Sequence, residues 1–144
     1  MAGTWKMYGP AVEFVNEGSI DMDTDTFKLM LTTVAYVPDQ DVHNFRDDVT
    51  NEVVGTAYVA GGNTLAGGTF AYDAGTNEYR IAWTSSTWAA STITARVAVI
   101  YKSRGGAASA DELLAYCVES ADVTSTADTF TVNLPSPTIK YTVS

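Results

Sequence analysis

The residue best suited to acid–base chemistry in this 144-residue sequence is its single histidine, His43. Imidazole is the side chain that most readily changes charge near neutral pH. Asp41, Asp47 and Asp48 lie close to it in the sequence, so a small hydrolase with a histidine–carboxylate pair is one interpretation. A hydrolytic triad also needs a nucleophile and an oxyanion site, and the sequence has no Gly-x-Ser-x-Gly elbow. We therefore expect a structural hydrogen bond in a loop, with an interface or metal contact as alternatives, and no catalytic residue.

Three alternating carboxylates, Asp21, Asp23 and Asp25, partly match a calcium-binding loop. The EF-hand pattern also requires Gly at its sixth position and Glu at its twelfth, where this sequence has Thr26 and Thr32. The match therefore fails. In an extended segment the three carboxylates would share one face and could form a weak cation site. We expect instead a solvated turn that leads into the next strand, and no tightly bound metal.

Two glycine pairs, Gly61-Gly62 and Gly67-Gly68, could in principle approach a phosphate group. A phosphate-binding loop would continue with Gly-Lys-Ser/Thr and open a helix, and neither feature follows these glycines. We therefore interpret both pairs as tight turns. The sequence predicts no cofactor.

The aromatic residues Trp83, Trp88 and Tyr79 could line a sugar-binding surface, because flat aromatic faces stack on pyranose rings. The alternative is that Trp83 lies in the core and Trp88 is half-buried at a loop. The single cysteine, Cys117, lies in the apolar run 113–118 and is expected to be a buried strand residue. One cysteine rules out an intramolecular disulfide.

Length and composition indicate one domain over residues 1–144 with its own hydrophobic core. A net charge of -9 argues against binding to nucleic acid, because phosphate contacts need a positive field. The apolar runs are shorter than the ~20 residues that cross a membrane, and the N-terminus lacks the pattern of a signal peptide. We therefore expect synthesis in the cytoplasm, with no membrane partner.

The chain organisation predicts a mainly β fold, an antiparallel β-sandwich or small barrel of seven or eight strands with a short N-terminal helix. Pro10 suits the first helical turn, and Gly18 suits the position after the helix end. In the strand over 78–83 and in the strand over 93–101, alternation places Ile81, Val97 and Val99 on the inward face. The other expected strands cover residues 26–37, 64–72, 113–118, 130–134 and 139–143. We also expect a hairpin turn over 73–76, and a long polar connection over 39–52 that includes a turn of helix at 46–51.

Several segments, taken together, resemble a group of small virion structural proteins of tailed bacteriophages and prophages. These segments are a short helix that ends at Glu17-Gly18, followed by residues 20–31, 36–38, 41–43, 48–53, 58–65, Trp88 and 92–96. The resemblance covers residues 9–118, whereas the last quarter matches only in being rich in strands.

The resemblance implies a capsid decoration (cement) protein or another accessory virion protein, with no catalytic motif to transfer. We therefore expect a homo-oligomer, such as a trimer, that binds the major capsid protein lattice on the surface of the virion, assembled in the host cytoplasm. One alternative is a tail- or fibre-associated protein that binds a host glycan through exposed Trp88 and tyrosines. The small hydrolase based on His43 is the other alternative.

Overall fold

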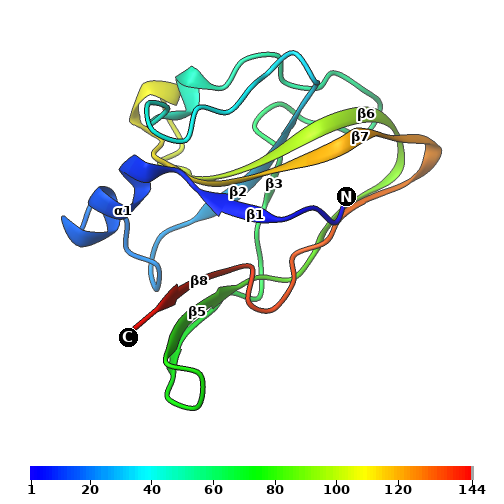
Figure 1. Ribbon diagram of the computed structural model, residues 1–144. Coiled ribbons are helices and arrows are strands. Elements are labelled where there is room, and N and C mark those ends of the chain that lie inside the picture. The colour runs from blue at the N-terminus through cyan, green and yellow to red at the C-terminus, as the bar shows by residue number, and fades with distance from the viewer. Residues whose placement is uncertain (144) are drawn as a thin grey trace.

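A computed structural model describes residues 1–143, and it confirms the expected mainly β fold class (Figure 1). Two antiparallel sheets are present. The larger has the strand order β1-β7-β6-β2-β3 and the smaller β4-β5-β8. The strands are β1 (Trp5–Met7), β2 (Phe27–Thr32), β3 (Asn63–Thr64), β4 (Thr69–Asp73), β5 (Glu78–Ala82), β6 (Ser86–Lys102), β7 (Leu113–Val132) and β8 (Ile139–Thr142), and the helices are α1 (Gly9–Asn16) and two single 3-10 turns, η1 (Arg46–Asp48) and η2 (Ala108–Ala110).

The five-stranded sheet is covered on both faces, by the connection over residues 33–62 on one side and by the three-stranded sheet on the other (Figure 1). On the first face the Tyr101 hydroxyl donates to the Gly61 carbonyl oxygen at 2.7 Å. On the second face the rings of Phe27 and Trp83 lie 5.5 Å apart. This double covering explains why residues 113–117 are all buried and read as one continuous apolar run.

The paired strands β6 and β7 form one long ribbon that bends and closes one side of the molecule (Figure 1). Irregular pairing interrupts the ribbon at several points, and Ala90 and Ala127 adopt positive φ angles of 50° there. The Asn63 side-chain amide donates to the Ser86 hydroxyl at 3.1 Å. This hydrogen bond joins the start of β6 to β3, the edge strand of the large sheet farthest from β1. On the other side, β1 and β8 are edge strands of the two sheets and do not pair with each other among residues 1–143.

Several local predictions are confirmed. Pro10 stands in the first turn of α1, and Gly18 follows the helix end with a φ of 79°, a backbone conformation that favours glycine. The β4–β5 hairpin turns over residues 74–77. Ile81, Val97 and Val99 are buried.

Other strand boundaries were wrong. The strand predicted over 26–37 ends at Thr32, because the chain turns there and the Tyr36 amide donates to the Thr33 carbonyl. The strand predicted over 64–72 is two strands separated by a turn that contains Gly67, with a φ of 65°. The strands predicted over 113–118 and 130–134 belong to the two ends of one strand, β7, which stops at Val132. Its polar middle over 119–129 carries no apolar alternation.

Candidate functional site

His43 belongs to a series of hydrogen bonds that attaches the segment over residues 33–62 to the core. The Tyr8 and Tyr36 hydroxyls lie 2.9 Å apart, and the Tyr36 hydroxyl lies 3.0 Å from His43 Nδ1. The Asp39 amide also donates to Nδ1 at 3.2 Å. Because an amide N–H can only donate, Nδ1 is an acceptor, and the neutral ring carries its proton on Nε2. The expected structural hydrogen bond is confirmed.

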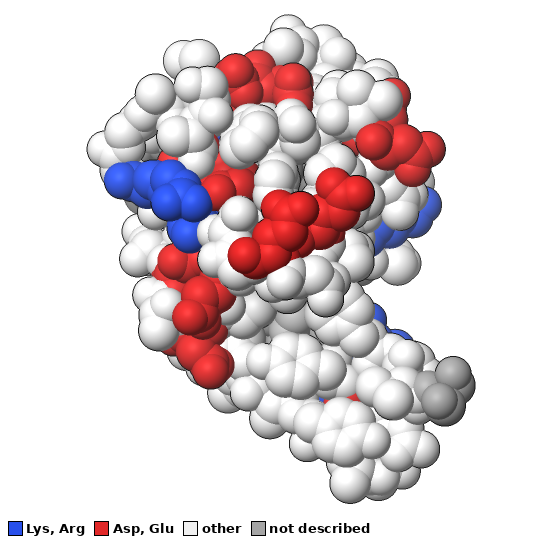
Figure 2. Space-filling view, turned by 90° about the vertical axis from the view of Figure 1, so that its left-hand side faces the viewer, with Lys and Arg blue, Asp and Glu red and all other residues white. Residues whose placement is uncertain are grey.

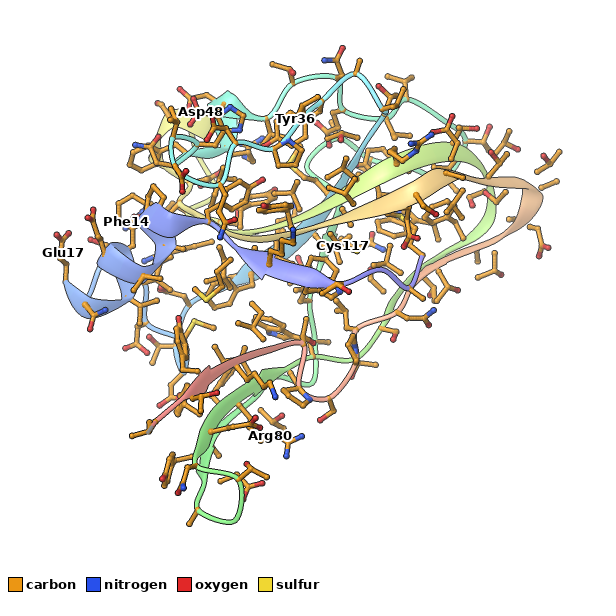
Figure 3. All side chains as sticks on the ribbon, viewed as in Figure 1. Phe14, Glu17, Tyr36, Asp48, Arg80 and Cys117 are labelled. Atoms are coloured by element: carbon orange, nitrogen blue, oxygen red, sulfur yellow. The ribbon has the colours of Figure 1, made fainter. Side chains whose placement is uncertain are left out.

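The carboxylates near His43 in the sequence do not pair with its ring among residues 1–143. Asp48 Oδ2 accepts instead from the backbone amides of Asn44 and Phe45, at 2.9 and 3.2 Å. Burial raises the pKa of Tyr36 to about 12, so its phenol is protonated at neutral pH. Figure 3 shows Tyr36 and Asp48 on the connection above the large sheet. The arrangement fixes a loop, and the histidine–carboxylate pair of the hydrolase interpretation is not assembled.

Asp21, Asp23 and Asp25 lie in a compact turn rather than on one face of an extended segment. The Asp21 amide donates to Asp25 Oδ2 at 2.7 Å, and the Asp23 amide donates to Asp21 Oδ1 at 2.9 Å. Asp25 also forms an ion pair with the largely buried Lys102, with Nζ 2.8 Å from Oδ2. Within the described part of the chain, no three His, Cys, Asp or Glu residues come together as metal ligands would. The expected turn is confirmed.

The aromatic residues considered for glycan stacking belong mainly to the core. Trp83 is 6% exposed and Trp88 is 4% exposed. The prediction that Trp88 is half-buried at a loop was wrong, because it lies within β6 and packs its ring between those of Tyr58 and Phe130. Only Tyr79 of the three remains half-buried. A sugar could not stack on either tryptophan without opening the core.

The glycine pairs form tight turns, as predicted, and Gly62 illustrates the physical reason. A Cβ atom at Gly62 would lie 1.8 Å from the Leu29 carbonyl oxygen, and its φ is 71°. Glu52 holds this turn in place, because its Oε1 accepts hydrogen bonds from the Gly61 amide at 2.6 Å and from the Tyr58 hydroxyl at 2.7 Å. The Leu31 amide in turn donates to the Tyr58 hydroxyl at 3.0 Å. The connection is therefore anchored to β2 at specific points.

Exposed apolar side chains concentrate on this anchored connection. Five of the nine exposed large hydrophobic side chains among residues 1–143 lie within residues 33–62, although this segment is about a fifth of the chain. They are Val34, Val37, Val42, Val54 and Val59, with exposed fractions from 55% to 97%. We call these five residues the valine surface. Sequence patterns do not predict this exposure, because isolated valines in a polar connection give no periodic signal.

Most basic side chains of the protein are neutralised by ion pairs, whereas most carboxylates of the described residues are not. Six of the eight basic side chains form ion pairs, each with a different acidic side chain, which leaves eleven of the seventeen carboxylates without an ion pair among residues 1–143. Acidic side chains are spread over the face that carries α1 (Figure 2). The pairs are Arg46–Asp111, Arg80–Asp73, Arg96–Asp122, Lys102–Asp25, Arg104–Glu112 and Lys140–Glu78.

Comparison with protein-family models, curated proteins and solved structures finds no match to this chain. Over residues 1–143, no helix has both the length and the apolar character needed to cross a membrane.

Cys117 is the remaining chemically reactive group. It is 1% exposed within β7, as predicted, and Figure 3 shows it inside the large sheet. Burial, with a contribution from the charge of Glu119, raises the pKa of its thiol to about 11. The thiol is therefore protonated and shielded at neutral pH.

Proposed function

We propose that this protein is a structural protein of a tailed-bacteriophage virion, a capsid decoration protein that binds the assembled lattice of the major capsid protein as a homo-oligomer. The proposal combines the sequence resemblance described above with the surface of the fold. It assigns a binding role, without a chemical reaction, to a protein whose single histidine serves to hold a loop.

The valine surface is the observation that carries the proposal. Exposed apolar side chains supply the area that a protein contact removes from water, and five of them lie on this one connection. Val54 and Val37 are 97% and 75% exposed, so contact with a partner would remove most of their surface from water. The connection is also anchored by Glu52, Tyr58 and His43, so little ordering would be required on binding.

A decoration protein should prefer assembled capsids to free coat subunits. Lattice sites exist only after assembly, and an oligomer that engages several subunits gains effective concentration. Binding should persist in moderate salt, because the valine surface is uncharged and would bind by removing apolar area from water.

The test mixes purified protein with empty capsids, with free coat protein and with host cells, at low and at high salt, followed by co-sedimentation. The variant Val37→Asn/Val54→Asn should lose capsid binding. The control is Val143→Asn, which changes a 55% exposed valine outside the connection. Equal binding to free subunits and capsids would refute the decoration role. Selective binding to cells that a simple sugar competes away would favour a tail-associated protein.

A further inference from the structure

A pocket of about 630 Å³ lies between the small sheet and α1 with the turn that follows it. Val12 and Val15 of α1 form one wall, and Tyr79 and Tyr141 form the other. Figure 1 shows this side of the molecule, with α1 above β5 and β8. Ile81 and Ile139, two positions from Tyr79 and Tyr141 on the same two strands, are paired and buried.

The two tyrosines provide an aromatic wall. Tyr79 and Tyr141 are direct cross-strand partners in β5 and β8, and their ring centroids lie 6.4 Å apart. Both rings are half-buried. The Tyr141 hydroxyl oxygen is buried without a hydrogen-bond partner among residues 1–143, which is uncommon for a polar atom in a native protein. Opposite them, Val12 is 41% exposed.

Two carboxylates, those of Asp21 and Asp23, also line the pocket. Neither forms an ion pair within the described chain, and the hydrogen bond from the Asp23 amide occupies only Asp21 Oδ1. Burial, followed by the charges of Asp23 and Asp21, raises the pKa of Tyr79. No Lys or Arg among residues 1–143 lines the pocket. Glu17, a further acidic residue, lies at the end of α1 (Figure 3). The pocket is therefore apolar along its walls and negatively charged.

We propose that this pocket binds a lysine or arginine side chain carried on an apolar segment of a partner protein. The tyrosine faces attract a cation, and the carboxylates accept its N–H groups. The aliphatic stem of such a side chain packs along Val12 and Val15, which a small inorganic cation could not do. This inference goes beyond the proposed function, because it holds whether or not the partner is a capsid protein.

The test uses the peptide N-acetyl-Leu-Arg-Leu-amide and its analogue with citrulline, which keeps the shape of arginine but carries no charge. Amide chemical shifts of the ¹⁵N-labelled protein follow the titration. A single pocket should bind the arginine peptide with a Kd of about 1 mM. The shifts should concentrate at Val12, Val15, Tyr79 and Tyr141, and the citrulline peptide should bind about tenfold more weakly.

The variant Asp23→Asn should weaken binding of the arginine peptide about five- to tenfold. No hydrogen bond of the turn uses the Asp23 side chain, so the variant should keep the fold, which its own amide spectrum checks. The control Asp47→Asn removes the same charge from an exposed residue that does not line the pocket, and should change the Kd less than about twofold.

Three results would overturn the proposal. They are equal binding of the two peptides, equal effects of Asp23→Asn and Asp47→Asn, and shifts that are absent at about 10 mM peptide or located elsewhere.

Discussion

The buried carboxylate of Asp111 should contribute more to stability than any exposed acidic residue. Its side chain is 2% exposed. Oδ2 accepts from Arg46 Nε at 2.8 Å, and Oδ1 accepts from the Arg104 amide at 2.7 Å. The Arg46 amide donates to the Asp111 carbonyl at 2.8 Å, so this residue joins η1 and the segment after η2 on one face of the large sheet.

The variant Asp111→Ala removes both side-chain hydrogen bonds at once. Hydrogen bonds to charged groups contribute about 1.5–3 kcal/mol each, and breaking a buried ion pair costs about 3–5 kcal/mol. Arg46 is 22% exposed at its side chain and keeps its position over the Tyr101 ring at 5.2 Å, so water can partly solvate it in the variant. We therefore expect a loss near the lower limit, about 3 kcal/mol in the free energy of unfolding.

Asp122→Ala is the matched control. It removes the same charge and an ion pair with the same geometry, Arg96 Nε to Asp122 Oδ1 at 2.8 Å, but Asp122 is 46% exposed. Exposed pairs contribute less than about 1 kcal/mol. Urea unfolding followed by tryptophan fluorescence measures both variants. A loss below about 1 kcal/mol for Asp111→Ala, or equal losses for the two variants, would refute the assignment of stability to this buried pair.

Four further predictions concern the core, the thiol, metals and pH. Val97→Asp places an unpaired charge at a 1% exposed position and should abolish folding, whereas a soluble variant that melts cooperatively would show that the strand register is wrong. Cys117 should react with a thiol reagent only after denaturation, and rapid labelling of the native protein would contradict its buried position. A chelator should leave the melting temperature unchanged, and a fall of several degrees would restore the turn over residues 21–25 as a cation site. Burial raises the pKa of Tyr36 and of Tyr101 to about 12. These phenols should therefore stabilise the fold fully below their unfolded pKa of about 10 and lose that contribution as pH rises toward about 12. Urea unfolding from about pH 8 to about pH 12 measures this, and constant stability across that range would contradict it.

Local sequence signals predicted the elements that depend on neighbouring residues. Pro10 and Gly18 marked the ends of α1, because the fixed φ of proline and the positive φ of glycine act locally. Alternation predicted the buried faces of β5 and β6, including Ile81 and Val97. The continuous apolar run that ends near Cys117 predicted a strand covered on both faces.

Features that depend on distant contacts could not be predicted in this way. The middle of β7 is polar, and this segment forms a strand because it pairs with β6 along the bent ribbon. The residues next to Trp88 in the sequence do not indicate whether its side chain faces water or the core. Its burial depends on packing against Tyr58 and Phe130, which are 30 and 42 positions away.

The same limit applies to the candidate sites. The sequence established that there is one histidine, one cysteine and an excess of carboxylates. Only the tertiary structure decided that Asp25 pairs with Lys102, and that Asp23 lies beside Tyr79 and Tyr141 with no ion pair among residues 1–143. Pairing and burial of a charged group depend on which segments fold against it, and residues more than fifty positions apart in sequence meet here because the small sheet folds back beneath α1.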